Sequence, residues 1–110
     1  KLAADGGSIQ YATYLGGNGT DIGRGIAVDA AGTIYAAGDT SMDDFPVRDA
    51  FQGADGVGCA GGVCPGRAMW VSFLRPLGQG HEDLVFSTYL GGNGDETAEA
   101  LVLGPDGLVV

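Results

Sequence analysis

The seven-residue stretch TYLGGNG occurs twice, at Thr13–Gly19 and at Thr88–Gly94, so equivalent residues of the two copies lie 75 positions apart. An internal repeat constrains the fold more than a single motif does, because each copy has to form the same supersecondary unit. Alternating apolar residues precede each copy, beginning at Ile9 and at Leu84. This pattern predicts a β-strand that ends in a glycine-rich corner.

The alignment at an offset of 75 continues without gaps on both sides of the motif, placing Ile26 on Leu101 and Gly32 on Gly107. Between the copies, alternating or continuous apolar runs are separated by turns, and no segment has helical periodicity. One period is therefore expected to contain four strands, with a further strand before the first corner. The expected strands are 25–29, 33–40, 68–74 and 83–91, and Ser8–Leu15 before the first corner.

Four short antiparallel strands per repeat predict an all-β, β-propeller-like fold, of which this chain holds about one and a half repeats. The 22 glycines among 110 residues do not indicate disorder, because 45% of the residues are apolar. Such a chain can form a core, so the glycines are interpreted as turns between short strands.

The chain divides into three expected parts. Residues 1–24 are the end of a preceding blade and its corner, residues 25–91 are one complete blade, and residues 92–110 start the following blade. Within the complete blade, residues 41–67 form a long connection that Phe45, Val47 and Phe51 are expected to anchor to the sheet. A chain that begins and ends within strands has open edges, and single blades are not expected to be stable alone. The expected partners are therefore adjacent blades of a longer chain, or neighbouring subunits in a homo-oligomer or filament.

Charge and hydropathy exclude two classes of partner. The formal net charge of −9 repels phosphate backbones, so nucleic acid is not expected to bind. No apolar run reaches 18 residues, so no segment is expected to insert into a membrane.

The two cysteines, Cys59 and Cys64, lie in the glycine-rich stretch GCAGGVCPG, which is expected to be too flexible to join the core. A disulfide is favoured over structural zinc, because zinc needs four ligands and the single histidine, His81, is distant in sequence. An exposed disulfide persists outside the cytosol, so an extracellular or cell-surface location is expected.

Other chemistry is weakly supported. The GGNG corner has no lysine and no following helix, which argues against a phosphate loop. Calcium is the one cofactor that the sequence suggests, since carboxylates and loop carbonyls suit a hard cation, but no DxDxDG loop is present. Its candidate ligands are Asp43, Asp44, Asp21 and Asp95.

No catalytic or cofactor-binding residue is assigned. A triad of His81 with Ser72 or Ser87 is formally available, but no GxSxG elbow occurs and His81 lies in a polar turn. Tyr14 and Tyr89 recur at the same position of the repeat, which favours a shared packing role.

Several motifs in order resemble the bacterial SBBP-type β-propeller repeat: YATYLGGNGTDIGRGIAVDAAGTIYAAGDT, then DFP, AFQ and FSTYLGGNGDE. The cysteine-containing stretch Gly53–Arg67 departs from that pattern as an insertion. In the second copy, EALVLGPDG stands where the family favours GIAVD followed by a turn of small residues. The resemblance implies large secreted or surface-attached bacterial proteins with several repeats. It supplies no catalytic residue.

The expected function is that of a non-catalytic extracellular or cell-surface scaffold or adhesion module, within a fibre or a larger repeat protein. The alternative is a wall segment of a catalytic propeller, a hydrolase or lyase whose active site forms elsewhere. The long loop and the corners are the expected sites of interest, because they project from a rigid frame.

Overall fold

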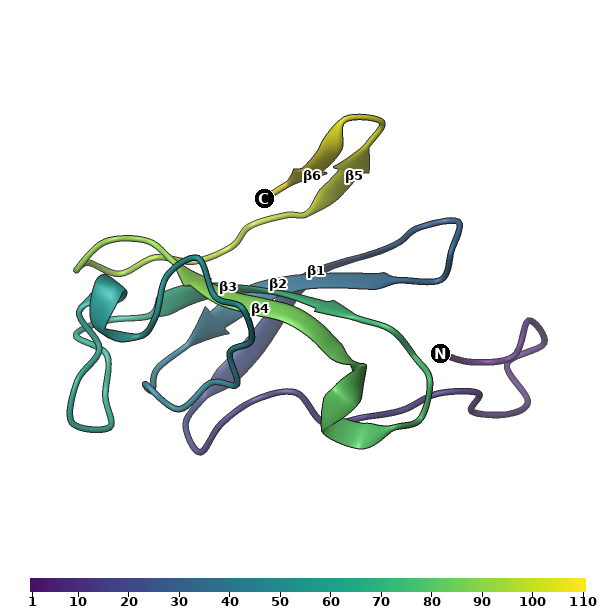
Figure 1. Ribbon diagram of the computed structural model, residues 1–110, viewed down its shortest axis with the longest axis horizontal. Helices are drawn as coiled ribbons and strands as arrows, with labels where there is room; N and C mark the ends of the chain where they lie inside the picture. The colour runs from purple at the N-terminus through teal and green to yellow at the C-terminus, as the bar shows by residue number, and fades with distance from the viewer.

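Four strands form one antiparallel sheet in the computed structural model, which describes residues 1–110 (Figure 1). Neighbours in the sheet follow chain order, so the predicted four-stranded antiparallel unit is confirmed. The strands are β1 (Asp21–Val28), β2 (Ile34–Thr40), β3 (Ala68–Leu74) and β4 (Leu84–Leu90).

The remaining elements are short. A separate hairpin consists of β5 (Val102–Gly104) and β6 (Gly107–Val109), and the 3₁₀ turns are η1 (Asp55–Val57) and η2 (Gly80–Asp83). Neither turn approaches the length or the apolar character of a membrane-spanning helix.

Strand β1 begins at Asp21, earlier than the expected start at residue 25. Its register against β2 shifts between Gly23 and Gly25, where a β-bulge interrupts the pairing. A bulge breaks the period-two alternation of side chains, so the polar residues before it do not read as a strand. The prediction that this segment lies outside the sheet was wrong.

The two faces of the sheet are covered by different parts of the chain. We call the face under the long connection the loop face, and the face under the β5–β6 hairpin the hairpin face (Figure 1). Cross-strand register places on the loop face Ile26, Val28, Ile34, Ala36, Ala68, Trp70, Ser72, Leu74, Leu84, Ser87 and Tyr89. It places on the hairpin face Tyr35, Ala37, Asp39, Met69, Val71, Phe73, Phe86, Thr88 and Leu90.

Residues that follow the second corner cover the hairpin face. Ala98 is buried against Ala37 and Val71, and Leu101 and Leu108 pack beside it. Aromatic rings of three adjacent strands also meet on this face, with centroids 4.7 Å apart between Tyr35 and Phe73 and 4.9 Å between Phe73 and Phe86. The sheet therefore buries apolar residues on both sides, as a central layer does.

The segment before the first corner does not form the expected strand. Ser8–Leu15 has no strand beside it, and its only bridge is an isolated one between Leu2 and Ile9. A strand is defined by pairing, so an alternating sequence without a partner remains irregular. Leu15 nevertheless packs against the core of the loop face.

The outer edge of β4 is covered by the long connection. The backbones of Arg48 and Ser87 exchange hydrogen bonds of 3.0 and 2.9 Å, and the Tyr89 amide donates to the Gln52 carbonyl at 3.1 Å. Pairing of this kind removes an exposed edge that would otherwise attract another chain.

Candidate functional site

The long connection is held to the loop face by an aromatic cluster at its start. The Phe45 ring stacks on Trp70 at a centroid distance of 4.5 Å and meets Tyr89 edge-on at 6.4 Å. The Tyr89 hydroxyl accepts from the Phe45 amide and donates to the Met42 carbonyl, both at 3.0 Å. Burial raises the pKa of Tyr89, so the hydroxyl keeps the proton it donates.

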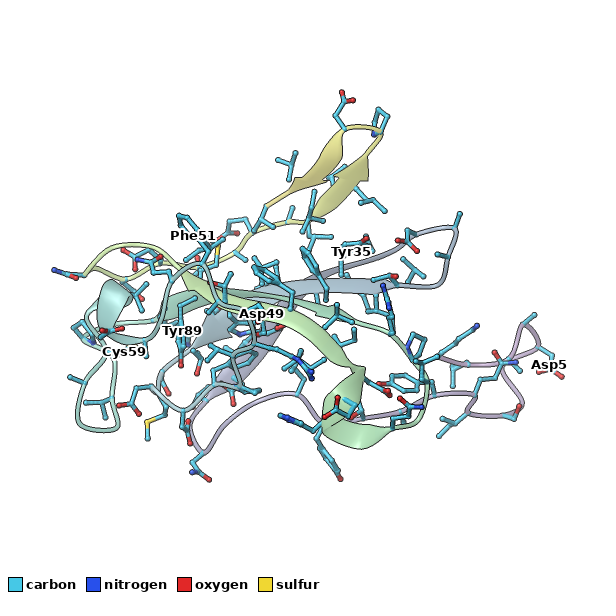
Figure 2. All side chains as sticks on the ribbon, in the orientation of Figure 1. Asp5, Tyr35, Asp49, Phe51, Cys59 and Tyr89 are labelled. Atoms are coloured by element: carbon cyan, nitrogen blue, oxygen red, sulfur yellow. A yellow bond between two sulfur atoms is a disulfide. The ribbon has the colours of Figure 1, made fainter.

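Phe51 and Val47, the two other expected anchors, are exposed, whereas Phe45 is buried. Phe45 is 2% exposed, as expected, whereas Phe51 is 82% and Val47 45% exposed. Phe51 lies on the side of the hairpin, where it lines a groove with Leu108 (Figure 2). The prediction that Phe51 and Val47 anchor the loop was wrong, because backbone pairing and Gln52 hold that part of the loop instead.

Gln52 is the second anchor, and its role was not predicted. Its side-chain amide donates to the Gly56 carbonyl at 2.7 Å and to the Gly91 carbonyl at 2.9 Å, and its Oε1 accepts from the Gly91 amide at 3.1 Å. One side chain thus ties the long loop to the second corner. The AFQ motif, one of the motifs that carry the resemblance to the repeat family, is the signal that could have found it.

The disulfide forms between Cys59 and Cys64, as predicted. The bridge closes a small hairpin in which Ala60 pairs with Val63, and Gly61 and Gly62 turn with φ of 64° and 95°. Positive φ values favour glycine at both positions.

Cys59 is not part of a flexible surface loop. It is 3% exposed and packs in the same core as Phe45, Val57 and Trp70. The expectation that the cysteine loop is too flexible to be core was wrong for this residue, because Cys59 follows the 3₁₀ turn η1 and packs into the core of the loop face.

Carboxylates close the first corner from two directions. The Gly17 amide donates to Asp21 Oδ2 at 2.7 Å, and the Asn18 amide donates to Asp44 Oδ2 at 2.9 Å. A Cβ on Gly16 would lie 2.6 Å from Asp21 Oδ2, so a side chain there would displace the carboxylate that folds over the backbone.

The second corner uses the equivalent acidic residue. Glu96 lies 75 positions after Asp21, and its Oε1 accepts from the Gly94 amide at 3.2 Å. A Cβ on Gly91 would lie 2.8 Å from Glu96 Oε2, matching the relation of Gly16 to Asp21. The first glycine of each GGNG corner therefore makes room for an acidic side chain that belongs to the corner itself.

The four calcium candidates are spread over three places. Asp21 and Asp44 reach the first corner, Asp43 accepts from the Gly62 amide at 2.9 Å, and Asp95 accepts from the Arg67 amide at 2.8 Å. No group of three or more potential metal-ligating side chains is assembled. Each carboxylate serves as an acceptor for a backbone amide, and calcium binding stays an untested prediction.

A buried ion cluster, not predicted from the sequence, joins the sheet to the second corner. Asp39 is 1% exposed and accepts from Arg24 Nε at 2.7 Å and from Arg67 Nη1 at 2.6 Å. Burial alone would raise the pKa of Asp39, but the two guanidinium groups outweigh it and hold that pKa below its usual range. The backbone of Arg67 also meets the corner, where the Glu96 amide donates to its carbonyl at 2.7 Å.

The serines and the histidine do not form a triad. Ser72 and Ser87 are buried and share a hydrogen bond of 2.7 Å across β3 and β4. His81 is exposed in η2 and makes no hydrogen bond to either serine.

The two repeated tyrosines do not share an environment. Tyr89 is 1% exposed, whereas Tyr14 is fully exposed at 103%. The prediction of a shared packing role therefore fails for Tyr14 within these residues, because no strand or loop lies over it as β3 and Phe45 lie over Tyr89.

Comparison with known families matches residues 10–46 to the family model described as beta-propeller repeat, SBBP. No match to the chain was found among curated proteins or among solved structures. The matched residues include the first corner, β1, β2 and the start of the long loop. Residues 10–46 thus match an SBBP-type beta-propeller repeat, and the motifs and the four-stranded antiparallel sheet agree with this match.

Proposed function

We propose that this chain is a non-catalytic blade of an extracellular or cell-surface scaffold, in which the sheet is packed between neighbouring blades. The observation that carries the proposal is that both faces of β1–β4 bury apolar side chains under chain segments from outside the sheet. Leu15, from before the first corner, packs on one face, and Leu101 and Leu108, from after the second corner, pack on the other. Repeat proteins gain stability from such contacts between neighbouring units.

The long loop is the display element of this scaffold. The aromatic cluster and Gln52 tie it to the sheet and the second corner, and the disulfide closes its tip, and a preorganised loop loses little entropy when it binds. A disulfide is typical of proteins in non-reducing compartments, which supports an extracellular or surface location.

A double-mutant cycle on the chain as it stands tests whether the hairpin face is an interface between blades. Val71→Ala on β3 and Leu108→Ala on β6 remove two side chains that line the same groove. If the hairpin docks on the sheet, their effects on the free energy of unfolding should be coupled by about 0.5–3 kcal/mol.

Val28→Ala paired with Leu108→Ala is the matched control. Val28 lies on the loop face and is 58% exposed, so additive effects are expected. Additivity in the Val71 and Leu108 pair as well would mean that the hairpin does not pack on the sheet, and the proposed stacking role would be rejected.

A further inference from the structure

Both corners contain an asparagine followed by glycine, at Asn18–Gly19 and at Asn93–Gly94, and both asparagines are exposed. Asparagine is a thermally labile residue, because the backbone nitrogen that follows it can attack its side-chain carbonyl carbon. Glycine in the following position has no side chain to hinder this attack. The repeat therefore presents one reactive dipeptide in two structural settings.

The attacking amide is free in the first corner and engaged in the second. The Gly19 amide donates to no backbone or side-chain acceptor. The Gly94 amide donates to Glu96 Oε1 at 3.2 Å. That bond has to break before the Gly94 nitrogen can turn towards Asn93, and the nearby carboxylate also disfavours loss of the proton from this nitrogen.

The Asn93 side chain is also restrained by the long loop. A Cβ on Gly58 would lie 3.0 Å from Asn93 Oδ1, so the side-chain carbonyl of Asn93 lies beside the Gly58 backbone. Turning this carbonyl towards the Gly94 nitrogen means leaving that position. Two restraints therefore hold the second dipeptide away from the arrangement in which it reacts.

Packing in the first corner favours glycine after Asn18. A side chain at position 19 would displace Met42, whose carbonyl accepts from the Tyr89 hydroxyl at 3.0 Å. The contact that shapes the first corner therefore also retains the residue that makes Asn18 reactive.

We infer that Asn18 is a site of spontaneous deamidation, and that its product weakens the attachment of the long loop to the first corner. The Gly19 nitrogen bonds to Asn18 Cγ, and the side-chain nitrogen takes up the proton from Gly19 and leaves as ammonia. The product is a succinimide. Water then adds to either ring carbonyl, the C–N bond at that carbonyl breaks, and aspartate or isoaspartate results at position 18.

The new carboxylate stands close to two others. Asp44 Oδ2 accepts from the Asn18 amide at 2.9 Å, and Asp21 Oδ2 accepts from the Gly17 amide at 2.7 Å. Like charges at such separations repel, and isoaspartate also adds a methylene to the backbone that these carboxylates hold. Because Asp44 directly precedes Phe45, the aromatic anchor, opening of this contact loosens the start of the long loop.

The rates of the two asparagines in one sample test the site. Trypsin cleaves between them, after Arg24 among others, and mass spectrometry follows the one-dalton gain of each peptide during incubation at mildly alkaline pH. In the folded chain, Asn18 should convert at least about fivefold faster than Asn93. In urea the two rates should be equal, because the stretch TYLGGNG is identical in both corners. Equal rates in the folded chain, faster conversion of Asn93, or a difference that persists in urea would overturn the assignment.

A variant of the second corner tests the cause of the difference. Glu96→Ala frees the Gly94 amide, so the rate at Asn93 should rise towards that at Asn18. An unchanged rate at Asn93 would show that the bond to Glu96 does not protect it.

A variant of the first corner tests the consequence. Asn18→Gln keeps a side-chain amide but has to form a larger ring, so its peptide should gain no mass and its Tm should stay constant during the incubation. The Tm of the unaltered chain should fall as Asn18 converts. Conversion of Asn18 without a fall in Tm would overturn the inferred weakening of the loop.

Discussion

At the residue scale, the positions of several glycines and charged residues in the repeat are explained by the side chains that they contact. Gly16 and Gly91 leave room for Asp21 and Glu96, so the first glycine of each corner accommodates the acidic side chain that follows it. The equivalence of Asp21 and Glu96 could have been predicted, since both lie five residues after the first corner glycine. The burial of Asp39 could not, because its two arginine partners are far apart in sequence.

Gly38 on β2 is expected to tolerate no side chain. A Cβ there would lie 1.9 Å from the Ile22 carbonyl oxygen and 2.6 Å from the Trp70 ring. Gly38→Ala should therefore lower the free energy of unfolding by about 1–3 kcal/mol or more, measured by urea denaturation. Gly23→Ala, where nothing lies within 4 Å, should change it by less than about 0.5 kcal/mol. Equal effects of the two substitutions would contradict the described packing of β1 on β2.

The cluster of Asp39 with its two arginines predicts that the free energy of unfolding depends on pH. A carboxyl whose pKa is lower in the folded than in the unfolded state stabilises the fold above its unfolded pKa, about 3.9, and that stabilisation is lost as pH falls through the folded value. Asp39→Asn should thus be destabilising at pH 7, by about 1–3 kcal/mol, and the difference should shrink below about pH 4.

Urea midpoints at pH 7, 4 and 3 measure this effect, with Asp106→Asn as the exposed control. If the urea midpoints of Asp39→Asn and of the unaltered protein fall in parallel with pH, Asp39 does not cause the loss of stability in acid.

At the element scale, strands with two neighbours were predicted well and segments without neighbours were not. β3 occupies the predicted residues 68–74, because apolar residues on both sides mark a central strand. β1 was placed four residues late because of its bulge, and Ser8–Leu15 was predicted as a strand although no strand lies beside it. Exposure of Tyr14 and Phe51 likewise depends on a neighbouring surface, which local sequence does not describe.

Gln52 is expected to couple the long loop to the second corner. Gln52→Ala removes three side-chain hydrogen bonds and should lower the free energy of unfolding by about 1–3 kcal/mol. The amide of Gly91 should also exchange faster with deuterium. Gln79→Ala, whose side chain is exposed, is the matched control and should change neither quantity. Unchanged exchange at Gly91 in the Gln52 variant would exclude this coupling.

The disulfide is expected to stabilise the loop without being required for the sheet. Cys59 and Cys64 are five residues apart, so in the chain-entropy view the bridge contributes about 2 kcal/mol. The double variant Cys59→Ala, Cys64→Ala should lose about that amount while its far-ultraviolet circular dichroism stays unchanged. Mass spectrometry after thiol alkylation establishes that the unaltered protein contains the bridge. Loss of the β-sheet signal in the variant would make the disulfide essential to the fold itself.

At the scale of the whole molecule, the sheet is a layer between two segments that share its repeat. The β5–β6 hairpin corresponds in sequence to the end of β1 and the start of β2, and it lies on the hairpin face (Figure 1). The repeat offset predicted this correspondence, whereas the side of the sheet on which each segment lies required the structure.

The central claim, that stability comes from contacts between successive repeats, is tested most directly by adding repeats. Because Val110 corresponds to Tyr35, appending residues 36–110 once or twice extends the chain in register by 75 residues each time. Equilibrium denaturation of the three chains should give a free energy of unfolding that rises with each added period in a single cooperative transition. A free energy that does not rise, or separate transitions for each repeat, would contradict the account.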